Sequence, residues 1–263
     1  MGQCSGKEHE PKQKGRQQGL QTPGIQREMI SRPSNVTIQI PRNRASEDGV
    51  VIPPVTRDMD SNILRAALDH VSNFVAQKRR AAIEVIAVGG AVNTLHLRTR
   101  ETTHDIDVFG FEFGNTSRIM LDEAMYDAQN QIPALGTDWL NTETQMWMPG
   151  PIREEITQLA RKQGVKVYDG SGLTILAAPW EYAFTAKINR ILTDLEQVRP
   201  YDLADAVAYL HEYITRNGNQ PVPVSTTVQK WAQRWNLQIT QEILRDEVAP
   251  EYLERYRRDG IVF

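Results

Sequence analysis

The sequence predicts an α/β (α+β) protein: helices flank a small mixed sheet, a helical part follows it, and a disordered arm precedes it. Three observations predict this organisation. Short β-branched runs alternate with helical periodicity over residues 59–218. Residues 219–263 carry helical patterns only. Aromatic residues begin at Phe74, so residues 1–58 contain none of the side chains that dominate cores.

Composition restricts the class of protein. Among 263 residues, 40% are hydrophobic and 24% charged, which is typical of a globular core. No stretch approaches the roughly 20 apolar residues of a membrane-spanning helix, and the N-terminus lacks the apolar core of a secretory signal. The single cysteine, Cys4, excludes disulfide frameworks and Cys-based zinc sites. The net charge of −3 argues against coating of nucleic acid. These features together lead us to expect a cytoplasmic protein.

The predicted arm spans residues 1–58. It is rich in Gln, Gly, Pro and Ser, and its net charge of +3 leaves −6 for the rest of the chain. Such a segment cannot bury enough apolar surface to offset the entropy of ordering. Residues 36–40 alternate like a strand, and we favour chance alternation in a tail over docking to a sheet edge or a partner.

The extreme N-terminus has the elements of a lipid anchor. Gly2 follows the initiator Met as N-myristoylation requires, and Cys4 is a candidate for palmitoylation beside basic residues from Lys7 onward. The motif requires Ser or Thr where this chain has Gly6. We therefore favour an unmodified terminus, with peripheral membrane contact through Gly2 and Cys4 as the alternative.

The folded region opens with a helix over residues 61–80, because Asp60 or Ser61 can cap it and apolar residues recur at helical spacing. A strand over 84–88 ends at a Gly-Gly pair, a brief helix follows over 91–97, and a second strand covers 105–109. The later patterns predict helices at 116–130, 152–163, 179–192, 201–215, 226–235, 239–246 and 250–258, and strands at 165–168 and 173–176.

The pair Gly89-Gly90 and the pair Asp105 and Asp107 carry the chemistry. Two glycines between a strand and a helix let the backbone pass close to a bulky anion, and N–H groups at the helix start bind phosphate oxygens. Carboxylates at i and i+2 of a strand project from one face and suit Mg²⁺, which completes its shell with phosphate and water. The alternative for the Gly-Gly pair is an ordinary turn without a ligand, and the alternative for the Asp pair is two solvent-facing acids. Acids within an apolar strand are costly without a ligand, so we favour a site for a metal-bound nucleoside triphosphate.

Gly89-Gly90 with Asp105-x-Asp107 resembles the signature of the nucleotidyltransferase superfamily related to DNA polymerase β. The chain looks closest to minimal bacterial and fungal nucleotidyltransferase-like proteins, including abortive-infection toxins. The segments 138–141 and 173–190, and the element Arg199-Pro-Tyr-Asp202-Leu-Ala-Asp205, are similar to later parts of the family pattern. The resemblance covers about residues 60–215.

The resemblance implies a nucleotidyltransferase-like topology for residues 59–218. It also implies Mg²⁺-dependent transfer of a nucleoside monophosphate from an NTP to a hydroxyl on protein, RNA or a small molecule. The implied catalytic residues are Asp105, Asp107, Lys187 and Asp202. Asp105 and Asp107 would also bind the metal, and Asp202 would position the Lys or the nucleophile. The implied nucleotide-binding residues are Gly89, Gly90, Asn93 and Arg190. The alternative for Lys187 and Arg190, an ordinary solvated helix face, has about equal weight.

Two departures from the family pattern leave a second hypothesis open. Many relatives have Lys where this chain has Tyr201, and a third carboxylate has no clear match. Glu112 falls on the wrong strand face by parity, which leaves Asp169 as the candidate. The alternative is therefore a catalytically inactive binding or scaffold protein of the same fold, lipid-tethered through Gly2 and Cys4. Direct nucleic-acid binding as the main function finds little support in the −6 balance.

Overall fold

The computed structural model describes residues 55–79, 81–110, 114–142, 144, 148–193 and 199–263. Most of the predicted arm, including Gly2 and Cys4, and also Glu112, lie outside the described residues. None of the helices in the described ranges combines the length and apolar character that a membrane span requires.

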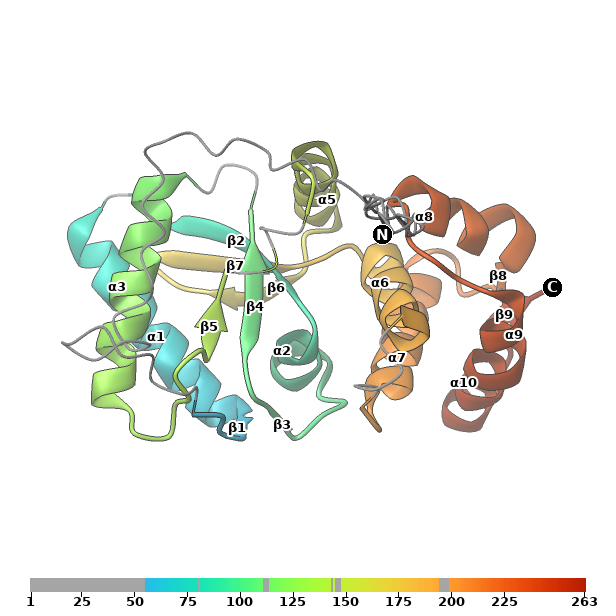
Figure 1. The fold of residues 1–263 in the computed structure, drawn as a ribbon, viewed down its shortest axis with the longest axis horizontal. Coiled ribbons are helices and arrows are strands. Elements are labelled where there is room, and N and C mark those ends of the chain that lie inside the picture. The colour runs from blue at the N-terminus through green and yellow to red at the C-terminus, as the bar shows by residue number, and fades with distance from the viewer. Residues whose placement is uncertain (1–54, 80, 111–113, 143, 145–147, 194–198) are drawn as a thin grey trace, which may run out of the picture. The chain divides into compact units, whose positions relative to one another are not determined.

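The described residues form a five-stranded mixed sheet with strand order β5-β4-β2-β7-β6 (Figure 1). Central β2 runs parallel to β7 and antiparallel to β4. At the edges, β5 is parallel to β4 and β6 is antiparallel to β7. The mixed sheet of the predicted fold class is thus confirmed. The strands are β2 (Ile83–Val88), β4 (Ile106–Phe109), β5 (Leu140–Asn141), β6 (Lys166–Asp169) and β7 (Leu173–Ala177).

Helices α1 (Ser61–Lys78) and α3 (Asn115–Gln131) pack against each other, and α1 and α5 (Gly150–Gln163) both contact β7. Helix α1 begins where expected, because the Asp60 carboxylate accepts hydrogen bonds from the first N–H groups, Asn62 and Ile63, both at 2.9 Å. The predicted brief helix after β2 is α2 (Gly90–Val92), which continues as a π-helical segment, η2 (Asn93–Leu97).

The helices α6 (Trp180–Thr193) and α7 (Asp202–Arg216) lie side by side, and the C-terminal residues pack onto them (Figure 1). The Trp231 ring meets Phe184 and Tyr213 edge-on, at centroid separations of 6.3 and 4.5 Å. The C-terminal elements are β8 (Val222–Pro223), η3 (Val224–Val228), α8 (Gln229–Arg234), α9 (Gln241–Ile243), η4 (Leu244–Val248), α10 (Ala249–Tyr256) and β9 (Ile261–Val262). Residues 219–263 therefore share the core of the preceding part.

The structure adds pairings that the sequence did not predict. Strand β1 (Met59–Asp60) pairs antiparallel with β3 (Thr102–Thr103). Residues 55–58, which fall in the predicted arm, run beside the loop that precedes β5. There, the Val55 N–H donates to Thr137 Oγ1 and the Thr137 N–H donates to the Val55 carbonyl, each at 3.0 Å. Val55, which falls in the predicted arm, is therefore hydrogen-bonded to the loop before β5.

Candidate functional site

The turn after β2 requires its glycines. Gly89 has φ of +76°, where L-residues are strained. A Cβ on Gly90 would lie 2.4 Å from Arg100 Nη1 and 2.6 Å from Thr103 Oγ1, so glycine allows both side chains to approach the backbone. The Tyr209 hydroxyl donates a 2.8 Å hydrogen bond to the Gly89 carbonyl. This bond attaches the turn to α7.

The two aspartates lie beside this turn. Asp107 is opposite Val88 in the β2–β4 pairing, and its Oδ2 lies 3.7 Å from the place that a Cβ on Gly89 would occupy. Asp105 directly precedes β4 and, like Asp107, is partly exposed. Its carboxylate forms no hydrogen bond or ion pair with any other residue in the described ranges. The structure therefore brings the Gly-Gly turn and an Asp-x-Asp carboxylate together, as the sequence predicts.

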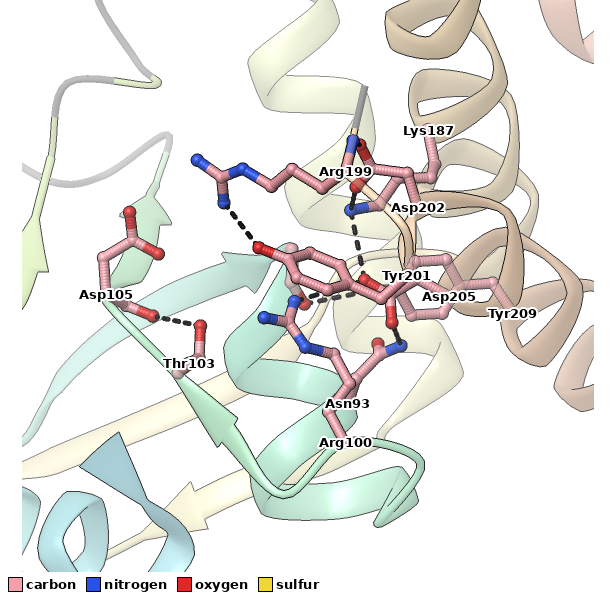
Figure 2. Close-up of polar contacts among 11 residues, drawn as sticks. Asn93, Arg100, Thr103, Asp105, Lys187, Arg199, Tyr201, Asp202, Asp205 and Tyr209 are labelled. Carbon is pink, nitrogen blue, oxygen red and sulfur yellow. Dashed lines mark hydrogen bonds and ion pairs between the residues drawn. The ribbon is translucent and has the colours of Figure 1, made fainter. Parts of the chain in front are cut away.

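Lys187 and two aspartates form a buried ionic cluster between α6 and α7 (Figure 2). The Lys187 Nζ lies 3.0 Å from Asp202 Oδ1 and 3.2 Å from Asp205 Oδ2. The three residues are 7%, 0% and 1% exposed, respectively. Buried charges are unfavourable unless they are paired and hydrogen-bonded, so each member needs the others.

Further donors complete the coordination of the two carboxylates. Arg100 Nη1 lies 3.3 Å from Asp205 Oδ2, and the Asn93 amide donates to Asp205 Oδ1. The Arg199 backbone N–H donates to Asp202 Oδ2 at 3.0 Å. The first turn of α7 is therefore contacted by side chains from η2, from the loop after η2 and from α6.

The environments of the two aspartates shift their pKa values in opposite directions. Burial raises the pKa of Asp202, but the Arg199 N–H and the Lys187 ammonium outweigh it, so the pKa lies below its ordinary value. Burial raises the pKa of Asp205 above its ordinary value, although Lys187 and Arg100 oppose this. Asp202 is thus the more strongly ionised partner of Lys187.

The two polar side chains predicted to bind nucleotide occupy different environments. Asn93 is 0% exposed and its amide faces Asp205, while its Oδ1 has no hydrogen-bond partner in the described part of the chain. Arg190 is partly exposed and lies near enough to Asp202 to contribute to lowering the pKa of that carboxyl. Asn93 is therefore part of the buried network, and Arg190 is at its margin.

Tyr201, Arg199 and Arg100 extend the site, although none of them was among the site residues expected from the sequence. The Arg100 guanidinium stacks on the Tyr201 ring, with Cζ 3.7 Å from the centroid. The Arg199 Nη1 donates to the Tyr201 hydroxyl at 3.1 Å. Figure 2 shows this hydroxyl directed toward the side of the site where Asp105 lies. The spacing of Arg199, Tyr201 and Asp202 was a usable signal, whereas nothing in the sequence marks Arg100.

Asp169 is wrong as a candidate third carboxylate. It pairs with Thr174, which is opposite Glu84 near the start of β2, whereas Gly89 follows the end of that strand. Its carboxylate instead contacts Lys166 Nζ at 2.6 Å and accepts from Thr174 Oγ1 at 3.0 Å. Within the described ranges, no group of three or more His, Cys, Asp or Glu is placed to hold a metal.

Comparison with protein-family models, with curated proteins and with solved structures finds no match for this chain. Any function assigned to this site must therefore come from its own geometry and chemistry.

Proposed function

We propose that the protein is a nucleotidyltransferase: it transfers a nucleoside monophosphate from an NTP to a hydroxyl acceptor with the help of Mg²⁺. Its sheet would then have the nucleotidyltransferase-like topology that the sequence motifs imply. The observation that carries the proposal is the position of the Gly89 turn, directly beside Asp107 on the neighbouring strand. An anion-binding turn and a carboxylate that suits a metal thus share one end of the sheet.

The donor set fits Mg²⁺. Asp105 and Asp107 offer hard carboxylate oxygens two positions apart, and Mg²⁺ commonly takes one or two carboxylates and completes its octahedron with water and phosphate. Within the described ranges, the Asp105 carboxylate forms no hydrogen bond or ion pair, which agrees with such a role. When bound, the ion would supply electrostatic stabilisation of the charge on the triphosphate.

Arg199 and Lys187 are the cations that would hold phosphate. The Arg199 side chain is exposed; burial lowers its pKa, but the hydrogen bond to Tyr201 and the nearby negative charges, Asp105 among them, raise it overall. It therefore stays charged and can donate to a phosphate oxygen. The Lys187 ammonium lies between Asp202 and Asp205, so its positive charge is held at the first turn of α7 and would add to the attraction for a phosphate.

Calorimetric titration of the full chain with ATP, CTP, GTP and UTP, with and without Mg²⁺, tests the proposal. We expect metal-dependent binding by the wild type and its loss in an Asp105→Asn/Asp107→Asn variant. Asp169→Asn is the matched control, because it neutralises a carboxylate at the opposite end of the sheet and should bind as the wild type does. Binding that is unchanged in the double variant, or absent from the wild type, would contradict the proposal.

A further inference from the structure

Three side-chain hydroxyls surround the Gly-Gly turn and Asp105, and their hydrogen bonds differ. Thr103 Oγ1 donates to the Asp105 carbonyl at 3.3 Å, and Tyr209 Oη donates to the Gly89 carbonyl. Tyr201 Oη instead accepts from Arg199. Within the described residues, it is the one hydroxyl of the three whose proton is not donated to the protein.

The Tyr201 phenol is held in place but remains reachable. Stacking with Arg100 fixes the ring, and the Arg199 guanidinium fixes the oxygen. The residue is the N-cap of α7, directly before Asp202, and is partly exposed. Arg199 interacts electrostatically with Tyr201 and also with Asp105, and Figure 2 shows the Tyr201 hydroxyl directed toward the side of the site where Asp105 lies.

We propose that Tyr201 is itself a nucleotide acceptor, so that the protein attaches a nucleoside monophosphate to its own phenol. This inference rests on the proposed function and names an acceptor for it. A phenol that is oriented beforehand beside a bound triphosphate has the advantage of proximity over a hydroxyl that arrives from solution.

The step balances without any reactant other than an NTP. Tyr201 Oη forms a bond to the α-phosphorus, and the bond from that phosphorus to the bridging oxygen of pyrophosphate breaks. The electron pair of the broken bond leaves with pyrophosphate, and the phenolic proton passes to water. Arg199 already donates to the phenolic oxygen and therefore stabilises negative charge that develops there.

The test is covalent labelling of the full chain. The protein is incubated with Mg²⁺ and each of the four NTPs in turn, and the product is analysed by intact mass and by peptide mapping. We expect the mass of one nucleoside monophosphate on the peptide that contains Tyr201. Tyr201→Phe removes the acceptor oxygen and keeps a ring that can stack on Arg100, so it should lose the label, and the mapped position of the label on the wild type distinguishes loss of the acceptor from loss of NTP binding. The matched control is Tyr126→Phe, which removes a hydroxyl from a partly exposed tyrosine on α3 and should keep the label.

The outcomes separate this inference from the proposed function. NTP binding without any label on the wild type, or a label that maps to another residue, would overturn the inference and leave the proposed function standing. Absence of NTP binding would overturn both. If Tyr201→Phe fails to fold, as thermal unfolding would reveal, the mapped position of the label on the wild type still decides.

Discussion

At the residue scale, Gly89 combines a left-handed backbone with a position directly beside Asp107. Replacing it with Ala should cost about 1–2 kcal/mol of stability, because a Cβ is strained at this φ. The added carbon would meet Asp107 Oδ2 only at ordinary contact distance, 3.7 Å, so the variant should still fold. Urea unfolding measures the change. Gly150→Ala is the control, since Gly150 has open space around it and begins helix α5, where an alanine should not lower stability.

Lys187 provides a second prediction at this scale. Lys187→Met should lower the free energy of unfolding by about 3–5 kcal/mol, because it leaves the buried carboxylates of Asp202 and Asp205 without their shared cation. Lys166→Met breaks an exposed ion pair with Asp169 and should change little. Urea denaturation of both variants checks this; similar losses for the two would contradict the importance assigned to burial.

Which site residues the sequence could predict depends on their separation along the chain. Gly89, Asp105 and Asp107 lie within one strand–helix–strand segment, where periodicity fixes the face on which each side chain lies. Asp205 finds its partners Asn93 and Arg100 at separations of 112 and 105 residues. No local pattern reports such a contact, so the buried role of Asn93 became visible only in the structure.

At the scale of elements, the long helices and the central strands were predictable and the two-residue strands were not. Helix α1 has a capping Asp60 and many apolar repeats, so periodicity and capping agree. Strands β1 and β3 have two residues each, too few to show an alternation, and their pairing is a tertiary event. Asp169 was misplaced for a related reason: β6 runs antiparallel to β7, so its last residue lies at the end of the sheet opposite Gly89, and the direction of a strand in a sheet cannot be read from that strand alone.

The contact between α7 and α10 leads to a prediction on pH. His211 stacks on Tyr256 at a centroid distance of 3.6 Å, and its Nδ1 lies 3.0 Å from the Tyr252 hydroxyl. Burial, and then the positive charge of Arg258, lower the pKa of His211 from its ordinary 6.5, with Glu212 opposing. The unfolded chain therefore binds the proton more tightly, so the stability from this contact is full above pH 6.5 and falls as pH drops below it.

Urea unfolding at a series of pH values from neutral to mildly acidic measures this dependence. His211→Gln should show a shallower loss of stability than the wild type over the same range. Because burial also lowers the pKa of His96, part of the slope should persist in the variant. An identical slope in both proteins would exclude His211 as a source.

At the scale of the whole molecule, the C-terminal residues belong to the same core as the sheet-bearing part. A chain that ends at residue 218 would expose the faces of Phe184 and Tyr213 that now contact Trp231. We expect such a chain to lose cooperative thermal unfolding and to bind a hydrophobic dye. A chain without residues 2–46 is a control of equal length, and it should unfold as the full chain does, because the sequence predicts no core residues there. Circular dichroism and dye fluorescence compare the two truncations.

The separation of 112 residues between Asn93 and Asp205 also has a consequence during synthesis. The ribosome releases the glycine turn and both strand aspartates first, and the partners on α7 follow about 5–20 s later at ordinary rates of translation. Until then, Asn93 and Arg100 lack Asp205, the carboxylate that they contact in the folded protein. A nascent or prematurely terminated chain therefore presents half of the site, and the protein gains its complete set of charges only after most of it has left the ribosome.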